Sequence, residues 1–266
     1  MKGAAERTIH LDPEERASLE EDLAQAREMS AMARKSGTLS EKGNVQMYLA
    51  ALITELEGPQ RALRHNRLAI RLYLQAGDPV DLAEARAILV IRLLEANRPS
   101  EALRHSRNTL EAFGAVAPEK RQDWIANRLA GLLLRAGHLE EGRAWLDLAL
   151  KGPFSMDHGG LMEDLARLLP AREARDWQFK ACAAYHRASF LVDEARALVT
   201  LARLERQLGD AWTTEALCRE ALAMAGPLEA EGLAQPNGIR RLVQRVHPKE
   251  SRLRLLPEGQ TPMRCH

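Results

Sequence analysis

Aromatic residues make up only 4% of this 266-residue sequence, and cysteine occurs three times, as Cys182, Cys218 and Cys265. The cysteines form no CxxC pair and their number is odd, so the pattern predicts neither a zinc site nor a disulfide framework. This cysteine usage fits a reducing cytoplasm. The longest apolar run covers only residues 87–91, far short of the roughly 20 residues that span a bilayer. We therefore expect a cytoplasmic protein with no membrane partner.

The sequence also lacks a strong net charge and the common catalytic motifs. Its formal net charge is +1, which gives no reason to expect a nucleic-acid or membrane surface. It contains no glycine-rich phosphate loop, no HExxH and no GxSxG. His65 and His105 occupy equivalent positions of a repeat, but a catalytic site would need a third group to converge on them. We predict that the chain is not an enzyme and binds no metal or cofactor.

The residues that are abundant, chiefly Ala, Leu, Glu and Arg, are strong helix formers. Proline and glycine divide the chain regularly, with proline opening segments and glycine closing them, as at helix ends. The expected helices cover residues 12–35, 39–57, 59–77, 79–97, 99–114, 118–137 and 139–150, followed by a short one near 161–169. Connections of two to six residues make consecutive helices fold back on one another. The prediction is an all-α chain of antiparallel helical hairpins.

A repeat is the strongest signal in the sequence. Two small residues seven apart occur on every second predicted helix, and the first members of these pairs are 38, 40, 40, 39 and 35 residues apart. The pairs are Ala24/Ala31, Ala62/Ala69, Ala102/Thr109, Gly142/Ala149, Ala181/Ala188 and Ala216/Ala223. Residues 62–67 also match residues 102–107, and residues 84–89 match residues 194–199. Small residues at this spacing let the two helices of a hairpin approach closely.

Helical hairpins with this ladder of small residues resemble tetratricopeptide repeats. The clearest unit has Ala126, Leu129, Ala130, Leu133, Gly137, Leu139, Gly142, Leu146 and Ala149 at the family's characteristic positions. Asn66 and Ser106 stand where the family prefers a bulky residue, and most units exceed its 34 residues. Long, degenerate repeats of this kind are similar to those of bacterial regulators. The resemblance implies a right-handed α-solenoid of about five to six repeats.

These signals divide the chain into four parts. We predict a flexible N-terminus over residues 1–11, a tetratricopeptide-like domain over 12–226, a capping helix region over 227–247 and a basic C-terminal tail over 248–266. From Gln235 to His266 there are seven basic and two acidic residues. Such a surplus suits either a solvated chain end or a contact with nucleic acid.

The resemblance also implies a binding site, because the first helix of each hairpin lines the concave groove in that family. The groove positions are Asn44, Met47, Glu84, Ile91, Trp124, Asn127, Arg128, Arg135, Glu194 and Glu205. Trp124 with Asn127 and Arg128 is the group most like a ligand site, since exposed Trp and Arg dominate interface energetics. Trp124 could instead pack between hairpins.

The sequence thus predicts a scaffold or adaptor that binds a protein or peptide. The alternative is an RNA- or DNA-associated regulator that uses an arginine-rich groove and the basic tail. No DNA-reading helix-turn-helix precedes the repeats, so nucleic acid is the less favoured partner.

Overall fold

The computed structural model describes residues 11–235 and 238–247 of the chain. The predicted flexible N-terminus and basic tail therefore lie almost entirely outside the described residues. The chain divides into two compact units, Met1–Gly152 and Pro153–His266. Each unit is considered by itself below. The described residues are helices, turns and loops without a strand, as the composition predicted.

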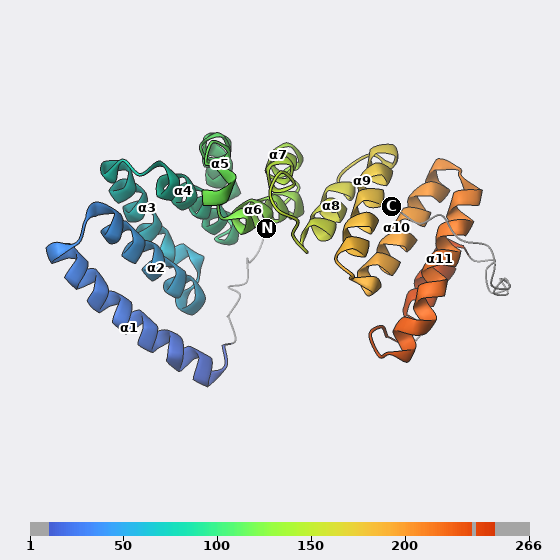
Figure 1. Cartoon of the computed structure of the whole chain (residues 1–266), viewed down its shortest axis with the longest axis horizontal. Coiled ribbons are helices and arrows are strands. Elements are labelled where there is room, and N and C mark those ends of the chain that lie inside the picture. Colours follow the sequence, from blue (N-terminus) through green and yellow to red (C-terminus); the bar gives the residue numbers. More distant parts are fainter. Residues whose placement is uncertain (1–10, 236–237, 248–266) are drawn as a thin grey trace, which may run out of the picture. The chain divides into compact units, whose positions relative to one another are not determined.

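The first unit is a series of helices that pack on their neighbours in the chain (Figure 1). Its elements are α1 (Pro13–Ser36), α2 (Leu39–Glu57), α3 (Pro59–Ala76), α4 (Pro79–Glu95), α5 (Pro99–Gly114), the 3-10 helix η1 (Pro118–Lys120), α6 (Asp123–Arg135) and α7 (Leu139–Ala149). Alternate helices also meet, because α4 packs on α6 and α5 packs on α7. Sequential packing of this kind is consistent with a helical repeat solenoid.

The second unit repeats this arrangement with fewer helices. Its elements are α8 (His158–Ala166), α9 (Ala171–Arg187), α10 (Leu191–Leu208), α11 (Ala211–Ala230) and α12 (Gly238–Val246). Helices α8 to α11 pack in chain order, and α12 lies against both α10 and α11. Helix α12 buries Ile239, Val243 and Val246 there. No helix in the described part of the chain is both long and apolar enough to cross a membrane.

The helix ends follow from local chemistry. Thr38 and Glu41 form a capping box at α2, in which each side chain bonds the other's backbone N–H. The Asp78 side chain accepts hydrogen bonds from the backbone of Val80 and Asp81 at the start of α4. Such caps satisfy backbone groups that a helix leaves unpaired at its first turn. Capping explains why most helix bounds could be predicted from the sequence.

Three predicted helix bounds were wrong. Pro118 opens the short helix η1 rather than α6, because Arg121 is extended and α6 begins only at Asp123. Helix α8 begins at His158, three residues before the predicted start. Helix α11 continues through Pro227 to Ala230, where burial of Leu228 offsets the hydrogen bond that proline cannot make.

The second helix of each hairpin buries a column of residues at positions i, i+4, i+7 and i+11. The columns are Ala62, Asn66, Ala69 and Tyr73 in α3, Ala102, Ser106, Thr109 and Phe113 in α5, Ala174, Gln178, Ala181 and Tyr185 in α9, and Thr214, Cys218, Ala221 and Ala225 in α11. Helix α7 buries the first three positions as Gly142, Leu146 and Ala149. The columns of α3 and α5, and those of α9 and α11, are offset by 40 residues.

The ladder of small residues predicted from sequence has the right register in α3, α5 and α7 and the wrong register elsewhere. In α1 the predicted pair, Ala24 and Ala31, is exposed, whereas Ala26 is fully buried. In α11 the buried pair is Thr214 and Ala221, and the predicted partner Ala223 is exposed. In α9 the pair begins one step earlier, at Ala174. These helices carry alanine on several faces, and the approach of a neighbouring helix decides which face is buried.

Candidate partner-binding face

The predicted groove residues of the first unit lie on α2, α4 and α6, and the structure separates them by exposure. Ile91 is buried in the core and therefore cannot meet a partner. Asn44 is exposed on α2, and its side-chain oxygen accepts a hydrogen bond of 2.6 Å from the Tyr73 hydroxyl. Met47 is half-buried, with its sulfur 3.3 Å from the amide nitrogen of Asn66. The α2 positions thus serve mainly to hold α3.

Glu84 belongs to the framework of the site. It is only 8% exposed, and its two carboxylate oxygens accept hydrogen bonds from Gln122, one from the backbone N–H at 3.1 Å and one from the side chain at 2.9 Å. Burial raises the pKa of Glu84, while the backbone hydrogen bond from Gln122 opposes the increase. This contact fixes the segment before α6 against α4.

Gln122 passes this order on to Trp124. Its side-chain oxygen accepts a hydrogen bond of 2.8 Å from the indole Nε1 of Trp124. The indole remains 52% exposed, so Trp124 does not pack between hairpins, the other possibility that the sequence left open. A large aromatic surface is therefore held in a defined orientation with one side in solvent.

Arg128 and Glu95 join α6 to α4 beside this tryptophan. The Nη2 atom of Arg128 lies 2.7 Å from Oε1 of Glu95, and the arginine side chain stays half exposed. Arg135, two turns further along α6, is exposed, and its Nε donates to the carbonyl of Gly131 at 2.9 Å. We call the surface formed by Trp124, Arg128, Arg135 and Glu95 the α4–α6 face.

Two buried polar atoms lie on the same helices. Asn127 is 8% exposed and Arg92 is 7% exposed. Within the described part of the chain, Oδ1 of Asn127 and Nε of Arg92 have no hydrogen-bond partner. Burial also lowers the pKa of Arg92. Buried polar groups are nearly always bonded, so these two atoms are unusual features of the framework under the α4–α6 face.

The predicted positions of the second unit, Glu194 and Glu205, are both buried on α10. Glu194 lies 2.9 Å from Nδ1 of His186, and Glu205 lies 4.0 Å from Nε of Arg175. Burial raises the pKa of Glu205, and Arg175 partly offsets this increase. These carboxylates bind neighbouring helices together and present little surface to a partner.

Sequence reasoning missed two residues of the site. Glu95 supplies the partner of Arg128, and Gln122 orients Trp124. No short motif marks either residue, because their partners are 33 and 38 residues away in the chain. Elsewhere in the described residues, no three His, Cys, Asp or Glu side chains gather as they would around a metal ion.

Comparisons with known proteins bear on the fold. No family model matches the chain, and no curated protein matches it. Among solved structures, the chain is similar to BtubC (BKLC) from P. vanneervenii, with a TM-score of 0.57 and 18% sequence identity. The match covers 89% of this chain and 95% of that chain. At this identity the likeness concerns the fold alone, and a fold by itself does not imply a function.

Proposed function

We propose that this protein is a non-enzymatic scaffold whose α4–α6 face binds a segment of a partner protein. The proposal includes the family and geometry that the sequence resemblance implies: a tetratricopeptide-like, right-handed solenoid of about five to six repeats. It also includes a cytoplasmic setting.

The exposed indole of Trp124 is the observation that carries the proposal. It lies 52% exposed on α6 while its Nε1 is held by Gln122, which is itself held by Glu84. Tryptophan and arginine are enriched among the residues that dominate binding energy. Ordering the indole before binding reduces the entropy that association costs.

The charges beside Trp124 favour a polypeptide as the partner. Arg128 and Glu95 place opposite charges next to each other on this face. A phosphate backbone would be repelled by Glu95, whereas a peptide of mixed charge can pair with both side chains. The RNA- or DNA-associated alternative therefore gains no support from the α4–α6 face.

Binding by Trp124 can be compared with binding by a second exposed tryptophan. Trp212, in the other unit, is 69% exposed and provides a matched control. Proteins retained by the wild-type chain would be quantified by mass spectrometry against Trp124→Ala, Arg128→Glu and Trp212→Ala. The affinity of the partner so found would then be measured by calorimetry with each purified variant.

We expect Trp124→Ala and Arg128→Glu each to weaken partner binding by about 1 kcal/mol or more, with unchanged circular dichroism. Trp212→Ala should bind as the wild type does. A partner that is lost equally from all three variants, or from none, would show that the α4–α6 face is not the binding site.

A further inference from the structure

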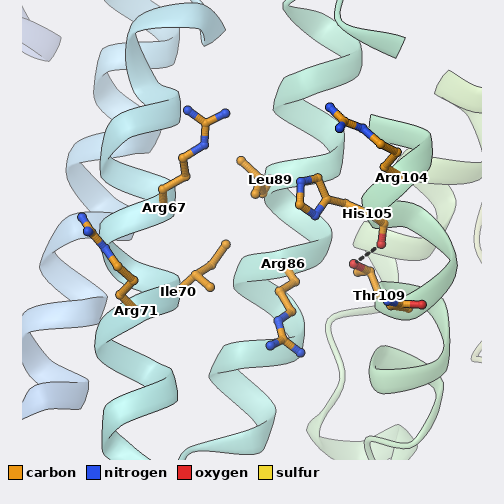
Figure 2. Close-up of a pocket in the computed structure, with 9 residues that line it drawn as sticks. Arg67, Ile70, Arg71, Arg86, Leu89, Arg104, His105 and Thr109 are labelled. Carbon is orange, nitrogen blue, oxygen red and sulfur yellow. Dashed lines mark hydrogen bonds between the residues drawn. The ribbon is translucent and has the colours of Figure 1, made fainter. Parts of the chain in front are cut away.

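A basic hollow of about 630 Å³ lies on the other side of α4, between α3 and α5. Ligand pockets usually have volumes of this order. It is lined by Arg67, Ile70, Arg71, Arg86, Leu89, Arg104, His105, Asn108 and Thr109. Figure 2 shows the His105 ring between the guanidinium groups of Arg104 and Arg86, with Ile70 and Leu89 forming an apolar wall. Arg71 points away to the far side of α3.

The same positions recur at 40-residue intervals in three layers of the first unit, and they are filled differently in each. In the first layer Gln46 receives a hydrogen bond or donates one at 2.9 Å to Nδ1 of His65, and its amide donates to Ser30 at 3.2 Å. Arg64 donates to the other ring nitrogen of His65 at 3.0 Å. This layer is a closed hydrogen-bonded chain.

In the third layer the equivalent positions are Leu110, Ala126 and Trp145. Trp145 is fully buried, and its Nε1 donates to Ser106 at 2.9 Å. The indole fills the space that a histidine occupies in the other layers, and Ala126 takes the place of Gln46. This layer is closed by apolar packing.

The second layer has Ile70, Arg86 and His105 at these positions, and it is open. Ile70 cannot accept a hydrogen bond as Ser30 does, and the guanidinium of Arg86 can only donate. Within the described residues, the side chains of Arg86 and His105 form no hydrogen bond or ion pair, and in Figure 2 Arg86 extends away from the ring. The layer contains donors and lacks the acceptor that closes the first layer.

The neighbouring carboxylate does not supply that acceptor. Glu101 lies 2.6 Å from Nη2 of Arg67 and also pairs with Arg98. It holds Arg67 at the rim, while Arg86 and Arg104 remain available across the hollow. Arginine donors in several orientations are the groups that bind phosphate oxygens best.

We propose that this hollow binds a phosphomonoester, with the phosphate between Arg86, His105 and Arg104 and an apolar organic part against Ile70 and Leu89. The layers on both sides are closed, so the hollow accepts one anion rather than a run of phosphates. A nucleic-acid strand would need such a run. This site is separate from the α4–α6 face and independent of its proposed function.

The other two layers suggest variants that should close the hollow without disturbing the fold. Arg86→Gln introduces the residue of the first layer, and His105→Trp introduces the residue of the third. Arg196→Gln is the control, because Arg196 occupies the position matching Arg86 in the similar segment 194–199 and is exposed on α10. Circular dichroism and thermal melting would check that each variant folds.

Calorimetric titration of the full chain with phenyl phosphate, inorganic phosphate and phenol tests the site. We expect phenyl phosphate to bind more tightly than inorganic phosphate and phenol not to bind. Arg86→Gln and His105→Trp should each weaken phenyl phosphate binding at least about tenfold, the effect of losing one charge-assisted hydrogen bond. Arg196→Gln should leave it unchanged.

The proposal is overturned if phenyl phosphate does not bind at millimolar concentration, or if folded Arg86→Gln and His105→Trp bind it as the wild type does. It is also overturned, in favour of a nucleic-acid site, if a single-stranded RNA oligonucleotide displaces phenyl phosphate at a much lower concentration and the same two variants abolish RNA binding.

Discussion

The two units of this protein bury the same column of positions, and the comparison separates what the repeat fixes from what it leaves free. The first and third positions hold small residues in both units. They are Ala62 and Ala69 in α3, Ala102 and Thr109 in α5, Ala174 and Ala181 in α9, and Thr214 and Ala221 in α11. Interiors are closely packed, so residue size is the property that close helix approach constrains.

The second position of the column varies in chemistry, and its polar occupants find partners on adjoining helices. Ser106 accepts from Trp145 in the first unit, and Gln178 donates to Glu163 and to the carbonyl of Ala197 in the second. Cys218 is buried at this position in α11. The repeat therefore tolerates different polar chemistry where a neighbouring helix can satisfy it.

The size constraint should give the largest effect. Ala221 and Ala223 lie two residues apart on α11, one fully buried and the other exposed. We expect Ala221→Leu to lower the free energy of unfolding by roughly 1–3 kcal/mol through overpacking, and Ala223→Leu to change it by less than about 0.5 kcal/mol. Urea denaturation of both variants measures the difference.

The same substitution can be applied in the first unit, where Ala102→Leu should cost as much as Ala221→Leu. Equal stability of Ala221→Leu and Ala223→Leu would mean that the column of α11 is wrongly assigned. A large cost in one unit and none in the other would mean that the two columns are not equivalent.

The polar position should give a smaller effect. Ser106→Ala removes the acceptor of the buried Trp145 Nε1, and leaving such a donor unsatisfied costs about 1–2 kcal/mol. Trp145→Phe in the same chain removes the donor. In a double-mutant cycle monitored by thermal denaturation, the combined loss should therefore be less than the sum of the single losses. Additive losses would show that the hydrogen bond contributes nothing.

The buried carboxylates of the framework should give the smallest effect, visible as a dependence on pH. Burial raises the pKa of Glu84, so the folded protein holds this proton more tightly than the unfolded chain, where the pKa is about 4.3. The resulting stabilisation is fully present below that value and is lost as the pH rises through the folded pKa.

Glu84→Gln lacks this titration. Relative to the variant, the wild type should gain stability as the pH is lowered from 7 to about 4, measured by urea denaturation at each pH. Glu119→Gln, on the exposed helix η1, provides the control. A difference between wild type and Glu84→Gln that stays constant with pH would contradict the assignment.

Much of the fold could be predicted from local sequence, because proline, glycine and capping residues mark helix ends directly. The bounds of α2, α3, α4 and α5 follow from such residues. The buried face of an alanine-rich helix could not be predicted in the same way. In α11, Ala216, Ala221, Ala223 and Ala225 differ little chemically, and only packing against α10 and α12 distinguishes them.

The candidate site was predictable to a similar extent. Register placed Trp124 and Arg128 on a helix where both are exposed. It also selected Glu84, Glu194 and Glu205, which are buried by residues that approach from other helices. A repeat pattern gives the position of a side chain on its own helix, whereas exposure depends on loops such as the one that carries Gln122.

The packing of each helix on its neighbours in the chain has a consequence for how the protein folds. Contacts within a hairpin and between adjacent hairpins join residues that are close in sequence, so little loop entropy is lost before they form. Folding can therefore begin in any well-capped hairpin and extend in both directions, without waiting for the chain ends to meet. Hairpins at the ends have a neighbour on one side only, so we expect unfolding to start there and move inward.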